Sequence, residues 1–70
     1  MDRRFVSSSN VSSVGYDQLT QTLEVEFLSG GIYQYYGVPE SIYSQMVQAA
    51  SKGRFLHLYI KNAYPYSRVG

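Results

Sequence analysis

Residues 22–36, "TLEVEFLSGGIYQYY", constrain the fold more than any other part of the chain. Apolar and polar side chains alternate on both sides of a glycine pair, which is the pattern of two antiparallel strands joined by a tight turn. In the first strand the apolar side chains are Leu23, Val25 and Phe27, and the polar ones are Thr22, Glu24 and Glu26. Successive side chains of a strand point to opposite faces. The hairpin therefore has one apolar face that the rest of the chain must cover.

The turn "SGG" at residues 29–31 can supply a loop of two or three residues, and the loop length sets the pairing. A loop of two residues places the glutamates of the first strand opposite tyrosines of the second. A loop of all three residues, with one glycine in the left-handed conformation, pairs Phe27 with Tyr33. Val25 then pairs with Tyr35. We expect this register because it sets apolar side chains opposite apolar side chains.

The same alternation directs Tyr33 and Tyr35 into the core. It directs Tyr36 to the outer face, alongside Gln34 and the two glutamates. Small domains often need disulfides or a structural metal, but this chain of 70 residues has no cysteine, and His57 is its only histidine. Eight tyrosines and three phenylalanines are the remaining source of buried surface. We therefore expect the tyrosine pair to fill the core.

The stretch "GVPESIYSQMVQAASKG", residues 37–53, predicts a helix that begins at Pro39 and stops at Gly53. Its apolar side chains recur at helical spacing: Ile42, Tyr43, Met46, Val47 and Ala50. "RFLHLYIKN", residues 54–62, predicts a second, shorter helix that leaves Leu58 exposed. Its side chains expected to pack inward are Phe55, Leu56, Tyr59 and Ile60, and those expected in water are Arg54, His57 and Lys61.

Two further segments extend the pattern. "VSSVGYD", residues 11–17, reads as a first strand in which Val14 and Tyr16 share a face. "YPYSRVG", residues 64–70, cannot continue a helix through Pro65 and should lie extended beside the sheet.

Residues 1–10 look like a flexible lead-in, which leaves residues 11–70 as a single domain. We expect an α+β fold: a three-stranded antiparallel β-meander followed by two α-helices packed on one face. No apolar run approaches the roughly 20 residues that span a bilayer, and Arg3 and Arg4 are not followed by the apolar stretch of a signal peptide. We expect a cytoplasmic protein without a membrane segment.

The charges divide along the chain. Residues 5–51 contain four acids and no base, and residues 52–70 contain four bases and no acid. In the second part, bases alternate with aromatic side chains, and such a mixture can meet both phosphates and unpaired nucleobases. The alternative is that well-spaced bases only keep a tyrosine-rich surface soluble.

No group of residues predicts catalysis. Glu24 and Glu26 lie about 7 Å apart on one face of a strand, but on its expected solvent side. His57 has no acid or cysteine close to it in the sequence, and no P-loop lysine follows "SGGIY". We therefore expect no enzyme activity, no catalytic residue, no metal, no cofactor and no small-molecule substrate.

The segments "SSSNVSSVGYD", "LEVEFLSGGIYQYYGVP", "SKGRF" and "YPYSRV" together resemble the KTSC domain family, whose central mark is a Y-x-Y pair, here Tyr33 and Tyr35. The resemblance covers most of the chain. It implies a short domain that occurs at the C-terminus of some lysyl-tRNA synthetases and alone in bacterial and phage proteins. RNA binding is suggested for the family by that association.

Two hypotheses follow. The first is a small non-enzymatic module that binds RNA through its basic C-terminal third. Its phosphate contacts would be Lys52, Arg54, Lys61 and Arg68, and its stacking rings would be Tyr64 and Tyr66. The second is a protein-interaction module, possible for a phage- or prophage-borne protein. It would use an exposed apolar patch near Leu58 or the outer sheet face, made of Glu24, Glu26, Gln34 and Tyr36.

Overall fold

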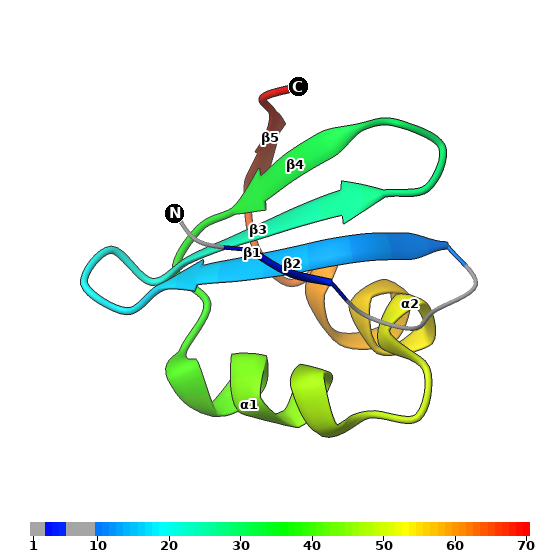
Figure 1. Ribbon diagram of the computed structural model, residues 1–70. Coiled ribbons are helices and arrows are strands. Elements are labelled where there is room, and N and C mark those ends of the chain that lie inside the picture. The colour runs from blue at the N-terminus through cyan, green and yellow to red at the C-terminus, as the bar shows by residue number, and fades with distance from the viewer. Residues whose placement is uncertain (1–2, 6–9) are drawn as a thin grey trace.

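The computed structural model describes residues 3–5 and 10–70 of the 70-residue chain. Its elements are β1 (Arg3–Phe5), β2 (Val11–Asp17), β3 (Thr22–Phe27), β4 (Ile32–Tyr35), α1 (Glu40–Gln48), α2 (Lys52–Phe55), the π-helix η1 (Leu56–Ile60) and β5 (Tyr66–Arg68). The strands form one antiparallel sheet in the order β1-β2-β3-β4-β5, and the helices lie on one side of it (Figure 1). The expected α+β fold is confirmed.

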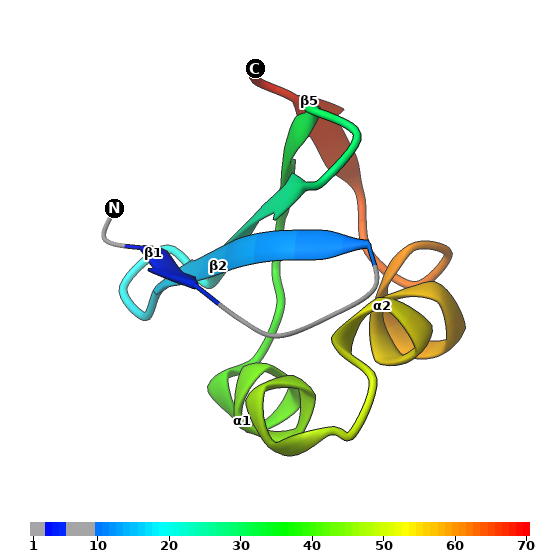
Figure 2. The same ribbon diagram turned by 45° about the vertical axis from the view of Figure 1, so that its right-hand side comes forward.

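The sheet has five strands, and the predicted meander of three is its centre. β2, β3 and β4 occupy the predicted segments, and β5 extends the sheet beside β4, as expected for the C-terminal segment. β1 was not predicted: it falls within the expected lead-in, and residues 1–2 and 6–9 of that lead-in lie outside the described residues. Three residues are too few to show an alternation, so only the pairing with β2 marks this strand. Figure 2 shows the sheet strongly twisted, with β4 and β5 rising away from α1 and α2.

The loop between β3 and β4 has three residues, as predicted, but it lies one residue earlier, at residues 28–30. Two backbone hydrogen bonds hold the ends of the loop together. The Phe27 N–H donates to the Gly31 carbonyl, and the Gly30 N–H donates to the Phe27 carbonyl, each at 2.9 Å. Gly30, with φ of 108°, takes the left-handed position that a loop of this length requires.

This shift of the loop moves the pairing by two residues, so the predicted register is wrong while the predicted faces are right. Tyr33 pairs with Val25, and Tyr35 pairs with Leu23. An even shift keeps every side chain on its own face. The observed register places Leu23 and Tyr35, both almost fully buried, side by side in the core.

The core lies between the sheet and the helices. Its buried apolar side chains are Val11, Val14, Leu23, Val25, Tyr35, Val38, Met46, Leu56 and Ile60. Tyr35 is 2% exposed and is the largest side chain of this set, whereas Tyr33 is half-buried at the border of the core. The expectation that tyrosine fills the core is confirmed for Tyr35.

The first helix is shorter than predicted. Pro39 is its N-cap rather than its first helical residue, and the helix ends at Gln48. Met46 is buried in the core, but Ala50, predicted on the same stripe, lies beyond the helix and is exposed. Gly53 is not a stop signal, because it is a buried residue inside α2.

The second helical segment changes its geometry along its length. α2 continues into η1, where the Lys61 N–H donates to the Leu56 carbonyl at 2.9 Å, five residues back. Leu58 is exposed as predicted. Tyr59 was predicted to pack inward but is 57% exposed, because the wider π turn rotates it off the face that Leu56 and Ile60 bury.

Candidate nucleic-acid interface

An open cleft with a volume of about 690 Å³ lies where the β3–β4 loop, β4, β5 and the segment after η1 meet. Its walls include Phe27, Tyr33, Tyr35, Lys61, Asn62 and Tyr66, and we call it the tyrosine cleft. It combines residues that are more than thirty positions apart in the sequence.

Strand pairing brings the aromatic side chains of the cleft together. Tyr66 stands opposite Tyr35, and Arg68 stands opposite Tyr33, so all four lie on the core-facing side of the sheet. The centre of the Tyr66 ring is 5.7 Å from that of Tyr35 and 5.9 Å from that of Tyr33. Because Tyr66 is 58% exposed and Tyr35 only 2%, Tyr66 is the ring that the pair presents to a ligand.

Two cations lie against these rings. The Lys61 Nζ is 5.3 Å from the centre of the Phe27 ring, and the Arg68 guanidinium carbon is 6.0 Å from the centre of the Tyr33 ring. Both distances are those of cation–π contacts. Of the carboxylates in residues 3–5 and 10–70, none lines the cleft. Among the described residues, Lys61 is therefore the charged side chain that lines the cleft, and Arg68 lies beside it.

The buried Tyr35 hydroxyl of the cleft keeps its proton at neutral pH. Burial, together with the neighbouring Tyr33 and Tyr66 phenols, raises the pKa of Tyr35 from 10.0 to about 12. Within the described part of the chain, no hydrogen bond engages the hydroxyls of these three tyrosines. They remain available to donate to, or accept from, a ligand.

The structure brings three of the six predicted RNA-contacting residues to this cleft. Lys61 and Tyr66 line it, and Arg68 lies beside it, over the Tyr33 ring. The sequence did not indicate that Phe27 and Tyr33 would join them. The alternation assigned both to the core, and only the pairing of β5 with β4 reveals that the core ends beside them.

The other three predicted residues lie elsewhere. The Lys52 amine donates a hydrogen bond of 2.9 Å to the Ala49 carbonyl, just beyond the end of α1. A cation at this end of a helix interacts favourably with the helix dipole. Tyr64 is half-buried and packs against the core. Arg54 is exposed on α2, outside the cleft.

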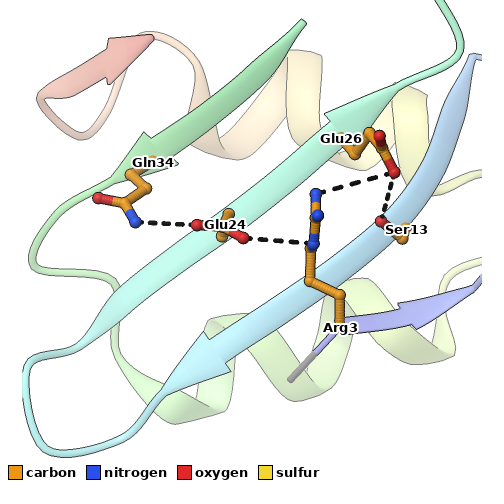
Figure 3. A network of polar contacts seen from close by, with 5 residues as sticks. All are labelled: Arg3, Ser13, Glu24, Glu26 and Gln34. Atoms are coloured by element: carbon orange, nitrogen blue, oxygen red, sulfur yellow. Dashed lines mark hydrogen bonds and ion pairs between the residues drawn. The ribbon is translucent and has the colours of Figure 1, made fainter. Parts of the chain in front are cut away.

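The outer face of the sheet carries a polar network instead of an open acidic surface (Figure 3). Arg3 pairs with both glutamates: its Nε is 3.3 Å from a Glu24 oxygen, and its Nη1 is 3.7 Å from a Glu26 oxygen. Ser13 donates to Glu26 at 3.1 Å, and the Gln34 amide donates to Glu24 at 2.9 Å. The strand alternation predicted the glutamates here, but Arg3 was missed because β1 was missed.

Tyr36 continues this network toward β5. Its hydroxyl donates to the Gln34 amide oxygen at 3.3 Å and also forms a hydrogen bond with the Ser67 hydroxyl. The polar groups of the outer face thus satisfy one another. Their attraction for a charged protein partner is correspondingly reduced.

Leu58 and Tyr59 form an exposed apolar pair on η1, and their exposed fractions are 55% and 57%. The sequence predicted only the first of them. This pair is the better placed of the two surfaces considered for protein contact.

Residues 3–5 and 10–70 contain no helix long and apolar enough to cross a membrane. The same residues contain no group of three or more histidine, cysteine, aspartate or glutamate side chains that could hold a metal ion.

Comparisons with known proteins place the chain among its relatives. The family model described as the KTSC domain matches residues 7–64. An uncharacterized protein from Stutzerimonas stutzeri is 40% identical over 70 residues, which cover 99% of each chain. A lysine–tRNA ligase from Nostoc sp. is 38% identical over 61 residues, or 87% of this chain, but the match covers only 11% of the ligase. The crystal structure of a KTSC domain protein from Yersinia pestis has a TM-score of 0.95 at 42% identity, with 99% of this chain and 97% of that chain covered.

Proposed function

The chain belongs to the KTSC domain family, and from this premise we propose that it is a small, non-enzymatic module that binds RNA in the tyrosine cleft. The observation that supports the proposal is the composition of the cleft: one exposed aromatic ring, the Lys61 cation and none of the described carboxylates, with Arg68 beside it. Unpaired bases stack on exposed rings, and phosphates are attracted to lysine and arginine.

The relatives support an RNA ligand. The lysine–tRNA ligase from Nostoc sp. contains a segment 38% identical to this chain, and its name makes a tRNA its substrate. A module that adds an RNA contact would suit that protein. An RNA ligand also fits a cytoplasmic location for the present chain.

The proposal assigns no catalytic residue. His57 is exposed on η1, and the glutamates of β3 are engaged by Arg3 on the face opposite the cleft. The proposed contacts are Lys61, Tyr66 and Arg68. Arg54 adds only long-range charge, and Lys52 and Tyr64 have structural roles.

The test is a titration of the protein into labelled single-stranded RNA at several salt concentrations. We expect binding that weakens with salt, because each neutralised phosphate contributes a slope of about 0.7 in the logarithm of affinity. Lys61→Ala should make the slope shallower by about that amount. Arg54→Ala is the matched control, since it removes an exposed cation outside the cleft, and it should leave the slope nearly unchanged. Absence of binding even at low salt would reject the proposal.

A second candidate function is protein contact through Leu58 and Tyr59, because these two side chains form an exposed apolar pair. A pull-down from a bacterial lysate, with and without nuclease, separates the two functions. A protein partner that survives nuclease and is lost in Leu58→Ser would favour the second. A set of partners that nuclease removes favours RNA.

A further inference from the structure

We infer that the tyrosine cleft takes a single unpaired nucleotide, with its base stacked on the Tyr66 ring and its flanking phosphates against Lys61 and Arg68. This inference rests on the proposed RNA-binding function and names the part of the RNA that the cleft recognises.

The number of accessible rings limits the site to one base. Tyr35 is 2% exposed and cannot present a ring face to a ligand. Tyr33 is half-buried, with Phe27 packed edge-on against it at 5.6 Å and an interplanar angle of 81°. Phe27 also lines the cleft, but it is half-buried and has Lys61 over its ring. Tyr66, at 58% exposure, is therefore the one mostly exposed ring among the aromatic residues that line the cleft.

The Tyr66 ring is held in place before a ligand arrives. It packs against Tyr33 at an angle of 48° and against Tyr35 at an angle of 38°. A ring already held in this way loses little conformational freedom on binding, which favours affinity for a small ligand.

The two cations match the two phosphates that flank one nucleotide. Arg68 follows Tyr66 by two residues on β5, so the two side chains share a face about 7 Å apart along the strand. The Arg68 guanidinium lies over Tyr33, which packs against Tyr66, and its Nε donates to the Gly70 carbonyl at 2.8 Å, which leaves its Nη groups for a phosphate. Lys61 lies one ring further along the same row, over Phe27, which packs against Tyr33. A longer RNA would find further cations only outside the cleft.

The size and polarity of the cleft also suit one nucleotide. Its volume of about 690 Å³ lies within the range of sites that enclose small ligands, which is about 300–1,000 Å³. The unengaged hydroxyls of its tyrosines can bond to the edge of a base or to a ribose hydroxyl. Bases in a duplex have their faces and pairing edges occupied already, so the cleft selects unpaired RNA.

The test is a length series of single-stranded RNAs, from a mononucleotide to an octamer, with a blunt duplex as competitor. We expect the affinity to level off by the trinucleotide, and the salt slope to be no steeper than about −1.4, which is two phosphates at 0.7 each. The duplex should compete roughly tenfold less well than a single strand of the same sequence. Affinity that rises steadily to the octamer, with a slope near −3, would overturn the single-nucleotide site and leave RNA binding standing.

Substitutions at two equally exposed tyrosines, Tyr66 and Tyr59, separate the contribution of base stacking to RNA affinity from that of charge. Tyr66→Leu should weaken binding by about 5- to 150-fold at an unchanged salt slope, because stacking releases no counterions. Tyr66→Phe keeps the ring and removes only the hydroxyl, so it should retain much more affinity than Tyr66→Leu, and it shows whether a substitution here is compatible with folding. Tyr59→Leu removes a ring of 57% exposure outside the cleft and should have no effect. Full affinity of a folded Tyr66→Leu would overturn the inference, whereas no RNA binding by the parent would reject the proposed function itself.

Discussion

Tyr35 on β4 and Tyr66 on β5 stand directly opposite each other in the sheet, and the centres of their rings lie 5.7 Å apart. One ring is 2% exposed and the other 58%. The pair therefore crosses the boundary of the core: the inner ring stabilises the fold and supports the outer ring, which faces the cleft.

Replacing the inner ring should cost most of the stability of so small a domain. We expect Tyr35→Ala to lower the free energy of unfolding by about 3–5 kcal/mol, as for other buried aromatic side chains. Tyr59→Ala, which removes an exposed ring, should change it by no more than about 0.5 kcal/mol. Chemical denaturation of the purified variants measures both values. A Tyr35→Ala protein that unfolds like the parent would mean that the core does not depend on this ring.

The stability of the fold should fall at alkaline pH partly through Tyr35. Its pKa is raised from 10.0 to about 12 by burial and by the neighbouring phenols, so the unfolded chain loses this proton first. The contribution of Tyr35 is therefore complete below about pH 10 and is lost as the pH rises through about 12. Tyr35→Phe has no proton to lose and should lose less stability over this interval, as measured by denaturation at a series of pH values. Parallel curves for the two proteins would contradict the raised pKa.

Strand alternation was enough to predict the faces of the hairpin. It placed Tyr35 in the core and Glu24 and Glu26 outside, and both assignments survive a register error because the error is an even number of residues. Alternation is a local property, so it does not depend on which loop residue takes the left-handed conformation.

The cleft could not be predicted in the same way, because it depends on contacts between distant segments. Tyr66 reaches Tyr35 only through the pairing of β5 with β4, and Lys61, at the end of η1, lies over the ring of Phe27, a residue far earlier in the chain. A single sequence records neither of these. Composition nevertheless indicated Lys61 and Tyr66 as candidates, since bases and aromatic residues alternate near the C-terminus.

The ion pairs of Arg3 should contribute modestly to stability and should respond to salt. Both partners are partly exposed, so we expect Arg3→Gln to cost about 0.2–1 kcal/mol at low salt and less at high salt. The variant leaves Glu24 and Glu26 without their cation. Arg54→Gln serves as the control, because Arg54 is exposed and forms no ion pair within residues 3–5 and 10–70. Equal effects of the two substitutions at every salt concentration would show that the Arg3 pairs contribute nothing.

Gly53 and Asn10 are in such close contact that each should determine what the other tolerates. A Cβ atom at Gly53 would lie 1.9 Å from the Asn10 Oδ1 and 2.7 Å from its Cγ. Alanine normally stabilises a helix relative to glycine by about 0.5–1 kcal/mol, but here the clash opposes it. Because the clashing atoms belong to the end of an exposed side chain that can turn aside, we expect Gly53→Ala to destabilise the protein by only about 1 kcal/mol, the low end of the usual cost of overpacking.

The same substitution should be tolerated once the Asn10 side chain is shortened. The atoms that a new Cβ would meet all lie beyond the Cβ of Asn10, so Asn10→Ala removes the clash. In that background Gly53→Ala should be neutral or stabilising, and the double-mutant cycle should give a coupling energy of about 0.5–3 kcal/mol. The cycle also cancels whatever Asn10→Ala costs by itself. Additive effects would show that the two residues do not touch. Contact with Gly53 would then not be what holds Asn10 in the wall of the tyrosine cleft.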